Sequence, residues 1–362
     1  MARKGKKKSL LFGITSRTLM TISAGLLIMS WLSVYVNPAK AWFMTIFGLL
    51  FPIFFFCNIF LLCWAVYRRS RAVIIPAVAL LPAVFMSGKF FRCGDSGDER
   101  EGGLKIVSYN VGRFMLPQDG FNADPSVCAD SVMSFLAHEN ADIICLQEFY
   151  MKDPERVLSY LSHKMKGYDI KYFVNVNSNG CYGNVTLSRY PSVAKGRVNF
   201  EHSSNMALYS DYVIDGEPFR IYNCHFESYN ISLSRVAAAM EKDYHKAVKD
   251  TEEKMRRSIT RRPRQVEQVL EDIDKCTENV IVTGDFNDTP MSYTYWRLSR
   301  KRKDTFIEAG SGSGATFSRL RPFLRIDYIL FPEAYEALNH KVLYSKKYSD
   351  HYPVESVIRR RP

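Results

Sequence analysis

Long apolar stretches without any charge dominate the first 92 residues of the chain. Residues 18–36 are uncharged over 19 positions, and residues 41–67 are uncharged over 27 positions. At about 1.5 Å of rise per residue, each stretch would cross a hydrocarbon core of roughly 30 Å. Few soluble helices are apolar on every face, so both stretches are predicted to be transmembrane helices rather than buried core helices.

A third apolar stretch, residues 72–91, is shorter. Only residues 72–87 are free of charge, and they include Pro76 and Pro82. The stretch spans the membrane if Lys89 extends its amine to the interface; the alternative is a re-entrant or interfacial helix. The pattern predicts a membrane anchor of two to three helices over residues 1–92.

Basic residues in the loops predict the orientation of this anchor. Five Lys and Arg residues lie within residues 3–8 and three within residues 68–71, whereas Lys40 is alone between the first two stretches. The positive-inside rule places the basic segments in the cytoplasm, so three spans put everything after residue 92 on the non-cytoplasmic side. A signal peptide cleaved near residues 39–41, in place of the first span, would leave this orientation unchanged.

The pattern changes at residue 104 to short strands alternating with helices, after a polar, glycine-rich segment (93–103) that is predicted to be a linker. Strands are expected at 105–109, 142–146, 168–174, 184–188, 207–214, 219–224, 279–282, 325–331, 341–345 and 354–358. Helices are expected at 125–139, 154–165 and 232–275, the last interrupted at Pro263, and Asp215-Gly216 is a hairpin turn signal. Many strands with few crossover helices predict an α/β domain of two packed sheets flanked by helices over 104–362.

Charge and cysteine usage narrow the possible functions. Residues 1–103 hold 13 basic and 4 acidic residues, whereas residues 104–362 hold 36 and 33. The domain therefore has a net charge of only +3, which argues against tight non-specific binding of nucleic acid. Five of the eight cysteines follow residue 103, and this odd count gives no disulfide framework. They show no CxxC spacing of the kind that binds a metal, and Cys145 and Cys224 are expected in the core.

Polar side chains follow the predicted strands at five places. These are Ser108-Tyr109-Asn110, Leu146-Gln147-Glu148, Asn223-Cys224-His225, 284–288 (GDFND) and Ser349-Asp350-His351. Taken singly, each has a plain explanation, because Asn and Asp form turns, a lone Glu is usually solvated and a lone His is usually structural. Together they are predicted to meet at one rim of the sheets.

In these segments the chain resembles the endonuclease/exonuclease/phosphatase superfamily, to which deoxyribonuclease I belongs. The matching segments run in family order over nearly all of 104–362: 105–114, 142–150, 183–191, 220–228, 280–288, 325–331 and 349–354. The resemblance implies a four-layer α/β/β/α sandwich and divalent-metal-dependent cleavage of phosphate esters.

The resemblance also implies a metal site. Glu148 matches the principal metal ligand, Asn110 matches the amide beside it, and Asp350 belongs to the final Asp-His pair of the family. Mg²⁺ or Mn²⁺ is therefore the expected cofactor, in keeping with the preference of hard cations for carboxylate oxygens.

The remaining matches imply the chemistry of hydrolysis. Asp285 and Asn287 match the pair that orients or deprotonates the attacking water. His225 matches a histidine that contacts the phosphate, and Asp327 matches the carboxylate that orients His351. No covalent nucleophile is implied.

The sequence leaves three functions open. The first is a membrane-anchored nuclease, the second a phosphatase or phosphodiesterase acting on lipid headgroups or small phosphate esters, and the third a binding module without catalysis. The expected partners are accordingly nucleic acid or a phospholipid headgroup as substrate and the lipid bilayer; no protein partner is inferred. The long charged segment between His225 and Asp285 is either a substrate-binding flap, a lipid contact or a solvated helix. The basic run 297–303 either steers phosphate substrates or solubilises a helix end.

Overall fold

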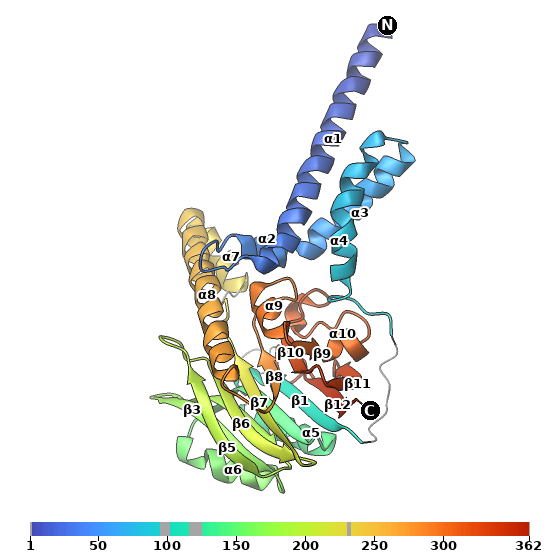
Figure 1. The fold of residues 1–362 in the computed structure, drawn as a ribbon. Coiled ribbons are helices and arrows are strands. Elements are labelled where there is room, and N and C mark those ends of the chain that lie inside the picture. The colour runs from blue at the N-terminus through green and yellow to red at the C-terminus, as the bar shows by residue number, and fades with distance from the viewer. Residues whose placement is uncertain (1, 95–101, 116–124, 230–232, 362) are drawn as a thin grey trace.

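Two six-stranded mixed sheets form the body of this computed structural model, which describes residues 2–94, 102–115, 125–229 and 233–361 (Figure 1). The first sheet has the order β11 (Tyr335–Val342), β12 (Val354–Arg360), β1 (Leu104–Asn110), β2 (Ile143–Met151), β4 (Gly180–Ser188) and β3 (Asp169–Asn177). The second has the order β5 (Ser192–Asn199), β6 (Met206–Ile214), β7 (Glu217–His225), β8 (Asn279–Asp285), β10 (Asp327–Pro332) and β9 (Arg302–Asp304). β1 pairs in parallel with β2, and β7 with β8.

Helices cover the outer faces of both sheets. The first sheet packs against α5 (Pro125–Glu139) and α6 (Val157–Lys164), and the second against α8 (Tyr244–Ile273) and α9 (Tyr293–Ser299). The remaining short elements are α7 (Leu233–Lys242), α10 (Thr305–Ala309), η3 (Gly112–Phe114), η4 (Pro154–Arg156) and η5 (Ser318–Leu320). A separate apolar cluster, including Ile106, Ile143, Ile221 and Ile281, fills the space between the sheets. The expected sandwich of two packed sheets flanked by helices is thus confirmed.

Several local predictions are confirmed and others are wrong. The helix at Pro125–Glu139 and the Asp215-Gly216 hairpin turn are present, and Cys145 and Cys224 are buried free thiols. β5 was not predicted, because this edge strand is mostly exposed and polar, and β9, α9 and α10 were not predicted either. The strand expected at 341–345 lies mainly before that range, at β11.

The break in the long charged helix was predicted at the wrong residue. α8 continues through Pro263, and the chain instead breaks at Asp243, whose carboxylate accepts the backbone N–H of Lys246 as an N-cap. On either side of Pro263, Arg262 and Gln265 bond to the chain at Glu227. These tertiary contacts hold the helix across a residue that normally ends one.

The N-terminal region forms a bundle of α1 (Ala2–Leu32), α3 (Phe51–Tyr67) and α4 (Ile74–Ser87), with η1 (Ser33–Tyr35), α2 (Met44–Leu49) and η2 (Arg71–Val73) between them. The apolar stretch 41–67 was predicted to be a single helix, and this prediction is wrong. The helix breaks at Leu50, just before Pro52 at the start of α3. Within the described ranges, one helix, Gly13–Tyr35, has the length and composition to cross a membrane. Phe51–Tyr67 and Arg71–Ser87 are shorter apolar helices. Most of the expected linker, residues 95–101, lies outside the described residues.

The bundle is packed against the α/β domain. Met291 lies in one apolar cluster with residues of α1, α3 and α4, and the rings of Tyr35 and Trp296 meet edge to face at 5.3 Å. A Cβ at Gly48 would lie 2.2 Å from the carbonyl oxygen of Met291, so only glycine permits this approach of α2. Arg325 donates from Nη2 to the carbonyl oxygen of Lys89 at 3.0 Å. The N-terminal bundle and the α/β domain therefore share a continuous interface.

Candidate active site

The two parallel strand pairs carry the predicted polar residues to one edge of the sandwich. Asn110, at the end of β1, is paired in register with Gln147, which precedes Glu148 in β2. His225 and Asp285 are register partners at the ends of β7 and β8, and Asp327 opens β10 opposite Asp285. Strand ends that are distant in sequence thus meet at a rim supported by both cores.

Asp285 lies at the centre of this rim and is only 1% exposed. Its Oδ2 accepts from the side-chain amides of Asn110 at 2.9 Å and Asn287 at 3.1 Å, and its Oδ1 accepts from the backbone N–H of Asn287 at 2.8 Å. Burial, together with the neighbouring Asp327, raises the pKa of Asp285 to about 6, although the nearby histidines oppose the rise. Asp285 is therefore a carboxylate whose proton affinity suits a base near neutral pH.

The backbone at position 284, at the end of β8, requires a glycine. Its φ is +126°, and an added Cβ would lie 2.0 Å from the carbonyl oxygen of Cys224 in the adjacent strand. Asn287 follows with a φ of 52°, a conformation that Asn tolerates better than most residues. The turn directs both Asp285 and Asn287 into the rim.

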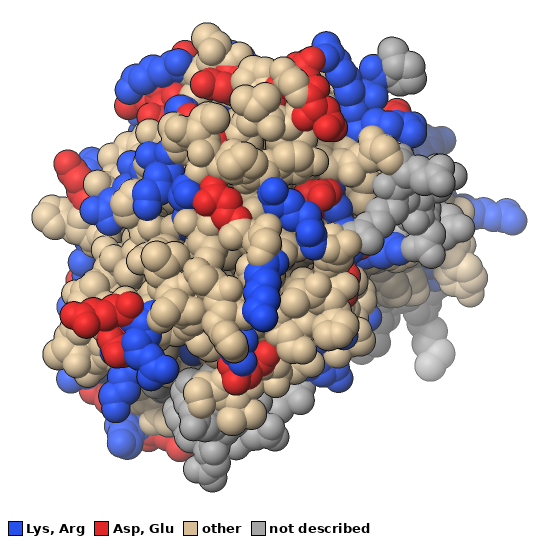
Figure 2. Space-filling view, turned by 90° about the horizontal axis from the view of Figure 1, so that it is seen from below, with Lys and Arg blue, Asp and Glu red and all other residues tan. Residues whose placement is uncertain are grey.

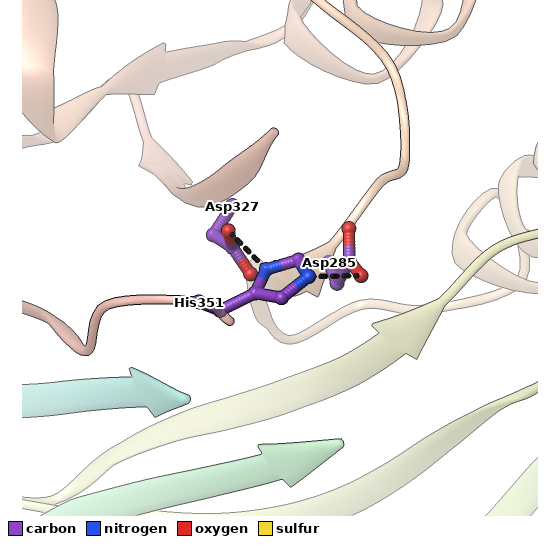
Figure 3. A group of neighbouring side chains, drawn as sticks. All are labelled: Asp285, Asp327 and His351. Atoms are coloured by element: carbon purple, nitrogen blue, oxygen red, sulfur yellow. Dashed lines mark hydrogen bonds and ion pairs between the residues drawn. The ribbon is translucent and has the colours of Figure 1, made fainter. Parts of the chain in front are cut away.

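His351 and Asp327 form a charged pair beside Asp285 (Figure 3). Nδ1 of His351 lies 2.9 Å from Oδ2 of Asp327, and Nε2 lies 3.8 Å from Oδ2 of Asp285. Burial alone would lower the pKa of His351, but Asp327 and Asp285 outweigh it and hold the pKa well above the usual value. His351 is thus an imidazolium at neutral pH, with its Nε2–H directed toward the centre of the site.

His225 has the opposite character. Burial lowers its pKa, so the imidazole is neutral at pH 7. Its Nδ1 lies 3.3 Å from the hydroxyl of Tyr182, whose own pKa is raised by burial and by Glu148, so the phenol keeps its proton. In the tautomer that accepts this proton at Nδ1, the ring proton of His225 is on Nε2, which is buried and has no hydrogen-bond partner among the described residues. An unpaired buried donor at this position is suited to a ligand oxygen.

A bulge in β2 directs Glu148 toward the same space. The register of β2 with β4 shifts between Leu146 and Phe149, and Glu148 has a φ of 54°, which is uncommon for a residue with a long side chain. Gln147 consequently points between the sheets, while the Glu148 side chain remains 24% exposed at the rim. Burial, with Asp350 nearby, raises the pKa of Glu148. The positive φ of Glu148 is a strained backbone conformation, and such conformations are concentrated at functional sites.

Glu148 and Asp350 have the character of metal ligands. The closest cation to Glu148 is Arg113, with Nε at 3.6 Å, and Arg319 lies 3.9 Å from Asp350, so both carboxylates retain accessible oxygens. Asn110 directs its NH₂ group to Asp285 and, at 3.4 Å, to Glu148, while its Oδ1 accepts the Gly112 N–H. Glu148 and Asp350 are thus the carboxylates at this rim that could hold a hard cation, while Asn110 fixes Asp285.

Asp285, Asp327 and His351 form a second group of ligand atoms, within 4.8 Å of one another. Because Nδ1 of His351 is engaged by Asp327, this group is better described as a hydrogen-bonded chain than as a metal cage. The structure thus brings all eight residues expected from the sequence, five for chemistry and three for metal, to one rim.

Several residues around the site were not predicted. Gln147 donates to Asn223 at 2.8 Å, and Asn223 donates to backbone carbonyls of the first sheet, so a buried polar network ties the two sheets together behind the site. Gln147 directly precedes Glu148, and Asn223 lies two residues before His225. Their positions next to predicted site residues were the only indication in the sequence that they support the site. Arg113 lies in one of the matching segments, 105–114, whereas Tyr182 lies just before the segment 183–191.

Arg262, in the long charged helix, clamps two loops of the site. Its guanidinium is buried, lies 3.0 Å from Asp288, and donates twice to the carbonyl oxygen of Glu227, at 2.7 and 2.9 Å. Asp288 follows the Asp285 turn, and Glu227 follows His225. The second half of the charged segment is therefore a packed support rather than a solvated helix.

Comparisons with known proteins agree with this geometry. The model of the endonuclease/exonuclease/phosphatase family matches residues 107–351, and that of a domain of unknown function (DUF8431) matches residues 8–90. No curated protein matches the chain.

Solved structures share the fold at low sequence identity. An endonuclease/exonuclease/phosphatase from Bacteroides vulgatus has a TM-score of 0.53 and 17% identity, covering 72% of this chain and 100% of that chain. The human Nocturnin catalytic domain with bound sulfate has a TM-score of 0.52 and 17% identity, covering 74% and 97%. An endonuclease/exonuclease/phosphatase from Beutenbergia cavernae has a TM-score of 0.50 and 16% identity, covering 72% of each chain.

Proposed function

The chain belongs to the endonuclease/exonuclease/phosphatase family, hydrolases of phosphate esters, and we propose that it is a membrane-anchored, divalent-metal-dependent enzyme that hydrolyses phosphodiester bonds. The observation that carries the proposal is the environment of Asp285. A buried carboxylate with a pKa of about 6 lies between a charged histidine, His351, and a neutral one, His225. Groups with separated pKa values in one site are the usual basis for dividing acid and base roles.

In this proposal, Asp285 accepts a proton from the attacking water, whose oxygen bonds to phosphorus as the ester P–O bond breaks; the ester oxygen leaves as the alcohol after taking up a proton from solvent. Asn110 and Asn287 hold the carboxylate in place for this transfer. The Nε2–H groups of His351 and His225 donate to phosphate oxygens where negative charge develops. A divalent cation held by Glu148 and Asp350 would neutralise non-bridging phosphate oxygens.

We further propose that α1, α3 and α4 lie in the bilayer. Their outward faces carry large exposed apolar side chains, including Ile22, Phe56, Phe60, Leu81 and Phe85. The N-terminus and the α3–α4 turn, with its arginines at 68, 69 and 71, both lie at the end of the bundle away from the domain (Figure 1). Together with the positive-inside rule, this supports a cytoplasmic basic end and a non-cytoplasmic catalytic domain. An alkaline-phosphatase fusion at the C-terminus should be active; an inactive fusion, with an active cytoplasmic reporter, would reverse the orientation.

The enzymatic proposal is tested with the purified full-length chain in detergent. Substrates should include bis(p-nitrophenyl) phosphate as a soluble diester, plasmid DNA, RNA and phospholipids, each with Mg²⁺ or Mn²⁺. We expect hydrolysis of the soluble diester that is lost in excess chelator and restored by the metal. Full activity in chelator, or no hydrolysis of any substrate, would contradict the proposal.

A further inference from the structure

The catalytic edge of the domain is also the edge that contacts the anchor. Met291, which is buried against the bundle, lies six residues after Asp285, and six residues span at most about 22 Å. Arg325, which donates to Lys89 at the end of the anchor, lies two residues before Asp327. Figure 1 shows the bundle standing on the end of the domain that carries α9. The site therefore lies close to the plane in which the anchor would leave the bilayer.

Exposed apolar and basic side chains occur together around this site, on the turn after β1 and on the loop between Phe317 and Leu324. We call them the rim cluster: Arg113, Met115, Arg319, Leu320, Arg321 and Phe323. Met115 is 54% exposed, Leu320 41% and Phe323 57%. Apolar side chains interleaved with arginines are typical of segments that insert into the headgroup region of a membrane.

Two arginines of the rim cluster lie beside Glu148 and Asp350, the candidate metal ligands. The Arg113 guanidinium lies 3.6 Å from Glu148, and that of Arg319 lies 3.9 Å from Asp350. The two segments approach each other at Asp350, since a Cβ on Gly112 would lie 3.2 Å from its Oδ1. Two guanidinium groups thus flank the carboxylates where a phosphate would bind, and exposed apolar side chains lie next to them along the chain.

We propose that the rim cluster rests on the bilayer and that the phosphate ester cleaved at this site belongs to a membrane phospholipid headgroup. The inference rests on the proposed function and specifies its substrate class. Arginines attract anionic headgroups, and Met115, Leu320 and Phe323 bury apolar surface among the acyl chains. Lateral diffusion within the same membrane then supplies the substrate to an enzyme that the anchor already holds there.

Nucleic acid fits these observations less well. Of the apolar side chains in the rim cluster, Met115 and Leu320 are aliphatic, and Phe323 alone offers a ring on which a base can stack. On the face of the domain opposite the bundle, away from this site, basic and acidic side chains are interspersed (Figure 2). The net charge of +3 on residues 104–362 also argues against tight non-specific binding of a polyanion.

The helical hairpin of α7 and α8 offers a second contact with the same surface. Its tip lies beside the bundle, level with α2 (Figure 1). Met240, Tyr244 and Val248 are exposed there, with Lys242 and Lys246 between them in sequence. Amphipathic side chains at this level are suited to the interface between headgroups and water.

The test uses the full-length chain in vesicles of phosphatidylcholine containing phosphatidylglycerol or phosphatidic acid. Release of headgroup or phosphate is measured by mass spectrometry, and hydrolysis of bis(p-nitrophenyl) phosphate is measured in the same vesicles. We expect phospholipid cleavage, and we expect the ratio of the lipid rate to the soluble rate to fall about tenfold or more in the double variant Leu320→Ser, Phe323→Ser. The matched control is Val193→Ser, Val213→Ser, two exposed valines at the far end of the second sheet, and its ratio should be unchanged.

The outcomes distinguish the inference from the proposed function. If the soluble diester or plasmid DNA is cleaved while phospholipids stay intact, the enzyme stands and the lipid inference is overturned. An unchanged ratio in the Leu320→Ser, Phe323→Ser variant overturns it as well. If nothing is cleaved, the proposed function fails and the inference fails with it.

A second measurement locates the rim cluster without relying on activity. Leu320→Cys is labelled with an environment-sensitive fluorophore in a chain whose exposed Cys57, Cys63 and Cys93 are replaced by serine. Lipids brominated near the headgroup should quench this probe but not the same probe at Val193→Cys. Equal fluorescence at residue 320 with and without bromine would overturn the membrane contact.

Discussion

Replacing Asp285 by asparagine should separate catalysis from structure. The substitution keeps the shape of the side chain but removes its ability to accept a proton from water. Loss of a general base typically lowers the rate by about 10²–10⁴-fold, which corresponds to roughly 3–5 kcal/mol in the activation free energy. We expect kcat on a soluble diester to fall by about 10³-fold.

The same substitution should change stability very little, because two opposing terms are of similar size. Each oxygen of Asp285 accepts from an N–H group, so an asparagine must direct its NH₂ at another donor, at a cost of about 1–3 kcal/mol. Against this, the carboxylate has its pKa raised from 3.8 to about 6 by folding. The ionised form therefore lowers the free energy of unfolding by about 3 kcal/mol at neutral pH, and asparagine removes that penalty.

The assay combines kcat on bis(p-nitrophenyl) phosphate with the thermal midpoint measured in chelator. Asp142→Asn is the matched control, since Asp142 accepts the backbone N–H of Lys105 at 2.8 Å before β2, at the opposite end of the sheet from Glu148. The control should keep normal turnover. Near-normal turnover of Asp285→Asn, with a loss of stability instead, would show that Asp285 only shapes its turn and would refute the catalytic assignment.

Three further results are expected. Glu148→Gln should raise the Mg²⁺ concentration for half-maximal activity about tenfold or more, because one ligand charge is lost; an unchanged metal titration would remove Glu148 from the site. His351→Ala should lower kcat by about 10²–10³-fold, and adding Asp327→Asn should change it little further, since the pair acts as one unit; additive losses in the double variant would contradict this. Burial lowers the pKa of His340 to about 3, so its contribution to stability is complete above pH 6.5 and is lost as the pH falls toward 3. Between pH 7 and pH 5 this costs about 2 kcal/mol, visible as a drop in thermal midpoint that His340→Gln should reduce.

The sequence predicted which residues meet at the site better than it predicted the residues that support them. Asp285, His225 and Glu148 could be identified because each stands at the end of an apolar strand, and strand ends converge in a sandwich. The bulge that turns Glu148 to the rim could not be predicted, because it depends on pairing with β4. Likewise, the burial of Arg262 depends on Asp288 and Glu227, and nothing in the sequence distinguishes Arg262 from the exposed Arg264 two residues later.

The anchor was predicted as a hydrophobic segment but not as a packing partner. Apolar composition predicted a membrane span at residues 18–36, but it gave no indication that Trp296, in a short helix far along the chain, lies against Tyr35. The break at Leu50 was missed for a similar reason. The absence of charge predicts an apolar environment for residues 41–67, but it does not predict where helices begin and end. Those boundaries depend on Pro52 and on contacts with the domain.

The close approach of Gly48 to Met291 has a practical consequence for anyone who wishes to produce the catalytic domain alone. Cutting the chain before residue 104 would leave Met291 and Trp296 uncovered, and such a fragment should self-associate or require detergent. Exchanging the anchor for an unrelated hydrophobic segment would lose the glycine on which the backbone contact depends. Anchor and domain are therefore not interchangeable modules, and protein engineering should treat them as a single unit.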